Sequence, residues 1–175
     1  MSRTLNTISA RLSLRPPQRE SLEILERICE IADPTQPMDL GHALDIIKSE
    51  YPSVTDFERD FPSLCFALAT GVGKTRLMGA FISYLYLTKR SRHFFILAPN
   101  LTIYNKIIED FTPGSPKYVF QGISEFVTAP PVVITGDTAT GTKSDKELFV
   151  YDRVDRKSPT LGKKAPKGAK VLFNG

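Results

Sequence analysis

The chain has 175 residues, of which 41% are hydrophobic and 24% are charged. These values are typical of a folded globular protein and exclude a disordered, collagen-like or coiled-coil chain. Two cysteines, Cys29 and Cys65, are too few for a disulfide framework or a cysteine-built metal site, so we expect reduced thiols in a cytoplasmic protein. No apolar run reaches the roughly 18 residues that a membrane-spanning helix needs.

The net charge of +4 is concentrated at one end of the chain. Residues 153–175 carry seven of the 23 basic residues and one of the 19 acidic residues, so the remainder holds 16 basic and 18 acidic residues. A nearly neutral body with a basic end does not by itself indicate a nucleic-acid-binding face. The basic run at 162–170 can contact phosphates nonspecifically, but a solvated tail is the simpler interpretation.

Before Glu20 the chain contains four arginines and no acidic residue. Leu5, Ile8 and Leu12 follow helical spacing in this stretch. A transit peptide can have such a composition. The preferred interpretation is a short polar lead-in to the first helix, which we expect at 17–32. A second helix is expected at 39–50, where Pro52 ends it.

Apolar runs then alternate with helical patterns. The runs at 64–69 and 93–98 predict buried parallel strands, and those at 117–122 and 131–135 are further strand candidates. Helices are expected at 74–87 and 101–111, the second capped by Asn100. This order predicts βαβ units in a parallel sheet. After residue 135, we expect a loop at 136–147, a short strand at 148–150 and a mobile segment at 155–170.

The motif that indicates chemistry is "LATGVGKT", residues 68–75, which we call the phosphate loop. Gly71 and Gly73 allow positive φ and bring backbone N–H groups against phosphate oxygens at a helix N-terminus. Lys74 can place its ammonium between the β- and γ-phosphates, and the Thr75 hydroxyl can coordinate Mg²⁺. The strict pattern has glycine where this chain has Leu68. The alternative is a glycine turn with an incidental lysine.

The segments "ATGVGKTRLMGAFISYLY" and "FFILAPNLTIYNKIIEDF" resemble the first motor domain of superfamily 2 helicases. More narrowly, they resemble the res subunit of type III restriction enzymes and related DEAD/DEAH-box proteins. The resemblance covers roughly residues 14–137 and is densest over 64–111. It implies an α/β P-loop NTPase fold with a partial RecA-like parallel sheet flanked by helices. The implied domains are an N-terminal helical segment with a Q-motif-like stretch (1–60), an incomplete RecA-like core (61–137) and a flexible Gly/Lys-rich tail (138–175).

The resemblance also implies site residues. Gln18 matches the glutamine that reads adenine, and Pro99 and Asn100 match a loop that contacts DNA, although Asn100 can also serve only as a helix cap. "ITGD" (134–137) is a weak match to a further motif. ATP and Mg²⁺ are the implied cofactors, with Thr75 on the metal. DNA and a modification methyltransferase subunit are the implied partners. The implied nucleotide-binding residues are Gln18, Thr70, Gly71, Val72, Gly73, Lys74, Thr75 and Arg76.

A catalytic pair that such motors need is missing from the sequence, because no Asp-Glu dipeptide occurs in the chain. A second motor domain with its arginine finger is missing as well. We therefore expect nucleotide binding with negligible hydrolysis, from the N-terminal piece of a larger motor. The alternatives are a non-hydrolysing nucleotide-binding fragment and a small P-loop kinase. The strict first glycine and the arginine-rich lid that a kinase would have are absent.

Overall fold

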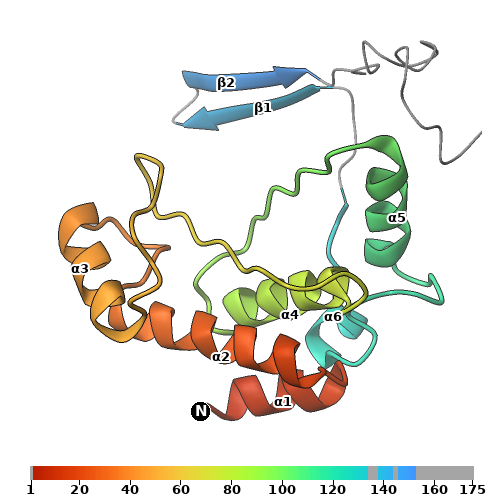
Figure 1. Cartoon of the computed structure of the whole chain (residues 1–175). Coiled ribbons are helices and arrows are strands. Elements are labelled where there is room, and N and C mark those ends of the chain that lie inside the picture. Colours follow the sequence, from red (N-terminus) through yellow and green to blue (C-terminus); the bar gives the residue numbers. More distant parts are fainter. Residues whose placement is uncertain (1, 134–137, 144–145, 153–175) are drawn as a thin grey trace, which may run out of the picture. The chain divides into compact units, whose positions relative to one another are not determined.

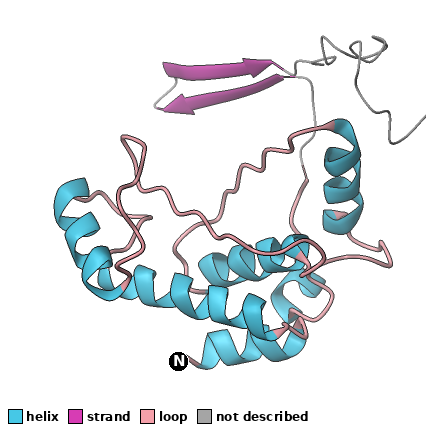
Figure 2. Cartoon of the chain, in the orientation of Figure 1, coloured by secondary structure: helices cyan, strands magenta, loops and turns pink. Residues whose placement is uncertain are grey.

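The computed structural model describes residues 2–133, 138–143 and 146–152. Its contacts divide the chain into two units, Met1–Val133 and Ile134–Gly175. The described part of the first unit is helical, and that of the second is a two-stranded hairpin (Figures 1 and 2). The helices are α1 (Arg3–Arg11), α2 (Pro16–Ile31), α3 (Leu40–Glu50), α4 (Lys74–Leu87), α5 (Leu101–Phe111) and α6 (Ser124–Thr128).

Local side-chain chemistry explains where three of the helices begin. The Ser2 hydroxyl accepts a hydrogen bond from the Leu5 N–H at the start of α1. The Asp39 carboxylate accepts from His42 N–H, and the Asn100 side chain accepts from Ile103 N–H, at the starts of α3 and α5. Each cap satisfies a backbone donor that the first helical turn leaves without an intrahelical partner.

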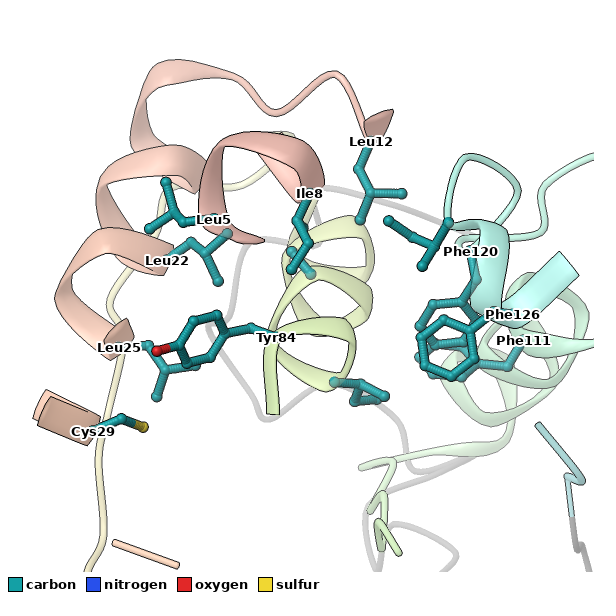
Figure 3. Close-up of a cluster of buried hydrophobic side chains, with 13 residues drawn as sticks. Leu5, Ile8, Leu12, Leu22, Leu25, Cys29, Tyr84, Phe111, Phe120 and Phe126 are labelled. Atoms are coloured by element: carbon teal, nitrogen blue, oxygen red, sulfur yellow. The ribbon is translucent and has the colours of Figure 1, made fainter. Parts of the chain in front are cut away.

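The main core of the first unit lies among α1, α2 and α4, which contact one another. Figure 3 shows Leu5 of α1 beside Leu22 of α2, with Phe111, Phe120 and Phe126 gathered elsewhere in the same cluster. Phe120 is 1% exposed, and its ring centroid lies 5.2 Å from that of Phe111 and 4.5 Å from that of Phe126. A smaller cluster joins α2 and α3 through Ile28, Ala32, Ala43, Ile47 and Phe57.

The N-terminal stretch is part of this core. Leu5 and Ile8 are fully buried and Leu12 is 6% exposed, so α1 packs its apolar stripe on α2 and α4. The interpretation of this stretch as a polar lead-in is therefore wrong. Helical spacing of three apolar residues indicated a helix here, but only the neighbours in space provide a surface that buries it.

The expected partial RecA-like parallel sheet, and with it the α/β fold class, is wrong for the residues that the structure describes. Among residues 2–133 there are six helices and no strand, and the runs at 64–69, 93–98 and 117–122 are irregular. The last two residues of 131–135 lie outside the described residues. An apolar run predicts burial, but a strand also requires a second backbone to pair with.

Two of these runs show what replaces the sheet. Phe66 packs edge-on against Phe81 of α4, with ring centroids 4.8 Å apart, while its neighbour Cys65 is exposed. At 117–122 the chain folds through successive turns, in which Gln121 N–H donates to the Tyr118 carbonyl. Some side chains of these runs thus pack against the helical core, but Phe120 is the one buried residue in the two runs, and their backbones do not pair into strands.

The second unit contains β1 (Thr138–Lys143) and β2 (Lys146–Asp152), which pair antiparallel. The register places Ala139 opposite Tyr151 and shifts between Gly141 and Thr142. The loop expected at 136–147 is therefore strand over 138–143, and the short strand expected at 148–150 lies within β2. The "ITGD" match at 134–137 and the tail at 153–175 lie outside the described residues. No helix in the described part of the chain has the length and apolar character that crossing a membrane requires.

Candidate nucleotide-binding site

The phosphate loop leads directly into α4, which begins at Lys74. Gly73 is the N-cap of this helix, with φ 96° and ψ 52°, and Gly71 has φ 82°. Both values lie in the left-handed region, which residues with a Cβ adopt only at a cost. Left-handed residues near a helix start turn successive N–H groups toward one side of the chain, where they can hold an anion.

The side chains of the phosphate loop are open to solvent. Lys74 is exposed, and its Nζ donates a hydrogen bond to the Ala69 carbonyl oxygen at 2.9 Å. Thr75 is half-buried and Arg76 is exposed. The helix provides no internal acceptor for the N–H groups of its first turn. An exposed cation and the N–H groups of the first helical turn therefore occur together at the start of α4.

The N-terminal end of α2 is fastened to the same loop. The Gln18 Nε2 donates to the Gly73 carbonyl oxygen at 2.8 Å, and the Arg15 Nη1 donates to the Gly71 carbonyl oxygen at 3.1 Å. Gln18 is only 1% exposed, and its Oε1 accepts from the Arg15 N–H at 2.8 Å. The structure thus brings Gln18 into contact with the phosphate loop.

Arg15 also contacts the candidate site, and the sequence alone did not single it out. It occurs in the segment "LRPPQ", three residues before Gln18, and is the N-cap residue of α2. Gln18 was assigned from that segment, so the position of Arg15 beside it in the sequence was the signal that could have identified Arg15. Its contact with residue 71 joins positions 56 apart in the chain, which no local pattern predicts.

The residues of the loop fit a phosphate group. A Cβ at Gly71 would meet no atom within 4 Å, so the backbone is open there. A Cβ at Gly73 would lie 2.7 Å from the Gln18 Nε2, so that side is closed by the amide. Within the described residues, no group of three or more His, Cys, Asp or Glu side chains could hold a metal ion. The loop has two hydroxyls, on Thr70 and Thr75, and that of Thr75 stands in the first turn of α4, where it could hold Mg²⁺ beside a phosphate.

Comparison with known protein families decides the relationship. The family described as type III restriction enzyme, res subunit, matches residues 11–164, which is most of the chain. The chain belongs to this family. The resemblance inferred from the phosphate loop is therefore confirmed, and membership relates the chain to the motor domains of helicases and translocases. No curated protein and no solved structure matches the chain.

The match to the res-subunit family includes Pro99 and Asn100 as well as the phosphate loop. Both residues are exposed, immediately before α5. The Asn100 side chain is engaged as the helix cap, with its Oδ1 3.0 Å from the Ile103 nitrogen. In the described part of the chain, no hydrogen bond joins either residue to the phosphate loop.

Proposed function

We propose that this chain binds ATP with Mg²⁺ through its phosphate loop, as the nucleotide-binding part of a DNA helicase or translocase motor of the restriction-enzyme type. The observation that carries the proposal is the loop itself. Two glycines with positive φ lead into α4, and the exposed ammonium of Lys74 stands at the first residue of that helix. Membership of the res-subunit family supports the same conclusion.

Each residue of the loop has a separate role in binding the triphosphate. Lys74 moves from the Ala69 carbonyl to the phosphate oxygens, which attract an ammonium more strongly than a neutral carbonyl does. Backbone N–H groups of residues 70–75 donate to the phosphates, and Arg76 adds a positive charge in the first turn of the helix. Thr75 holds Mg²⁺ through its hydroxyl, and the bound metal neutralises phosphate charge.

We expect this chain to bind ATP with negligible hydrolysis. Its sequence contains no Asp-Glu dipeptide, which in related motors holds Mg²⁺ through water and orients the attacking water. A non-hydrolysing nucleotide-binding module is therefore the behaviour that we assign to these residues by themselves.

DNA is the polymer on which the proposed motor acts. Pro99 and Asn100 stand at the exposed N-terminus of α5, where helix N–H groups favour a phosphate. A methyltransferase subunit as partner and a cytoplasmic location are extensions of the same proposal, from the family and from the two unpaired cysteines.

Calorimetric titration with ATP–Mg²⁺ tests the proposal through Lys74→Ala. The parent should bind, and the variant should lose at least about tenfold in affinity, because a charge-assisted hydrogen bond to phosphate contributes about 1.5–3 kcal/mol. Its unfolding midpoint without nucleotide should match that of the parent, since Lys74 is exposed. Lys106→Ala, at an exposed lysine of α5, is the matched control. Equal binding by both variants, or early unfolding of Lys74→Ala, would contradict the assignment.

A further inference from the structure

The carbonyl groups of the phosphate loop are held by the first turn of α2. Arg15 donates to the Gly71 oxygen and Gln18 donates to the Gly73 oxygen, at 3.1 and 2.8 Å. The two donors are the N-cap residue of α2 and the residue three positions later. The two acceptors are the carbonyls of Gly71 and Gly73, so the N-terminus of α2 holds two peptide groups of the phosphate loop.

Both the oxygen and the nitrogen of the Gln18 amide make hydrogen bonds in this arrangement. Its oxygen accepts from the Arg15 N–H, and so caps α2, while one of its two N–H donors is on Gly73. The side chain is 1% exposed. Turning the amide toward an adenine edge would require breaking both bonds and uncapping the helix. The geometry therefore separates Gln18 from the base-reading role that its sequence context implied.

Holding a carbonyl also orients the N–H group of the next residue. A trans peptide is planar, and its N–H points opposite to its C=O. The Gly73 carbonyl accepts from Gln18 and, at 3.2 Å, from the Leu77 N–H of α4, so the Lys74 N–H is directed to the other side. The Gly71 carbonyl, held by Arg15, does the same for the Val72 N–H. Cis peptide bonds are absent from the described residues, so this relation applies to both peptide groups.

We infer that Gln18, supported by Arg15, is a positioning residue of the phosphate loop, and that its contribution to nucleotide binding does not depend on the base. It aims the N–H groups of Val72 and Lys74 at the phosphates by holding the carbonyls on the opposite side. This inference rests on the proposed function, since it assigns the work of Gln18 within the same site.

The test compares three ligands on the purified chain: ATP–Mg²⁺, GTP–Mg²⁺ and inorganic tripolyphosphate with Mg²⁺. Gln18→Met keeps the length and neutrality of the side chain and removes both hydrogen bonds. We expect it to lower the affinity for all three ligands by a similar factor, about tenfold. Gln121→Met, at an exposed glutamine, is the control and should bind all three as the parent does. Loss of ATP binding alone, with tripolyphosphate unaffected, would overturn the inference.

A purely structural role for Gln18 would lower the unfolding midpoint without changing the affinity of the folded protein, and that result would also overturn the inference. If Gln18→Met does not fold, Arg15→Lys replaces it. This variant alters an exposed side chain, retains the charge and loses the guanidinium fork. It should weaken all three ligands equally, by about threefold, and an effect on ATP alone would contradict the inference.

Lys74→Ala distinguishes failure of nucleotide binding from failure of the positioning role of Gln18. If the parent binds no ligand, or if Lys74→Ala binds all three as the parent does, the proposed function fails and the inference fails with it. If Lys74→Ala abolishes binding while Gln18→Met affects ATP alone, the phosphate loop stands and only the positioning role is lost.

Discussion

At the scale of single residues, Gly71 and Gly73 provide a matched pair. Both have positive φ, 82° and 96°, so alanine at either position costs about 1–2 kcal/mol in backbone strain. Only at Gly73 would the new Cβ meet a neighbour, the Gln18 Nε2 at 2.7 Å.

Gly73→Ala should therefore be more harmful than Gly71→Ala. It displaces the amide that holds the loop and should cost about 1 kcal/mol more in stability. Thermal unfolding without ligand and titration with tripolyphosphate measure the two effects. Equal losses in both variants would show that the contact with Gln18 has no influence.

The two cysteines should differ sharply in reactivity. Cys65 is exposed and Cys29 is 2% exposed in the core. Burial raises the pKa of the Cys29 thiol from 9.0 to about 11, and the nearby Arg90 only partly opposes the shift. A disulfide reagent at pH 8 should modify Cys65 at once and Cys29 only on unfolding.

The raised pKa of Cys29 also predicts a pH dependence of stability. The folded state keeps its proton above pH 9 while the unfolded state loses it, so stability falls as pH rises from about 9 to about 11. The loss is on the order of 1–2 kcal/mol. Cys29→Ala should flatten this slope in part, because burial raises the pKa of Tyr84 in the same direction. Cys65→Ala should leave the slope as in the parent, and an unchanged slope in Cys29→Ala would count against the assignment.

At the scale of elements, α5 depends on its own cap more than on the core. Its buried residues are Asp110 and Phe111, each 5% exposed and both at its C-terminal end. Asn100→Ala removes the bond to the Ile103 N–H and should cost about 1 kcal/mol locally. Amide hydrogen exchange should then accelerate in the first turn of α5. Asn100→Asp retains a capping oxygen and should exchange as the parent does, whereas equal protection in the alanine variant would exclude a role for the cap.

The predicted helices agree with the structure better than the predicted strands do, because helices depend on residues close together in the chain. The helices expected at 74–87 and 101–111 have those bounds in the structure, and Asn100 caps the second. Helical hydrogen bonds join residues four apart, so a short window contains the information. The strands expected at 64–69 and 93–98 are absent because strand pairing needs a distant backbone. α6 was not foreseen, since its five residues carry too little periodicity.

At the scale of the whole first unit, Phe120 is among the most deeply buried side chains of the main core. This ring is 1% exposed and lies against Phe111 and Phe126. Phe120→Ala should lower the free energy of unfolding by about 3–5 kcal/mol, since the cavity cannot collapse among rigid rings. Phe61→Ala, at a ring that is 59% exposed, is the control and should change it by less than about 1 kcal/mol. Denaturant unfolding measures both, and similar midpoints for the two variants would show that the aromatic cluster is not the centre of the core.

The sequence by itself determined the phosphate loop, the two helices that follow it, the cap at Asn100 and the family relationship. Each of these depends on residues close together in the chain, where glycine geometry, capping and helical periodicity act. Only the tertiary structure decided that α1 belongs to the core, that the apolar runs at 64–69 and 93–98 form no strand, and that Arg15 and Gln18 hold the carbonyls of a loop more than fifty residues away. These outcomes depend on which distant segments meet, and an apolar pattern predicts burial without naming the partner that buries it.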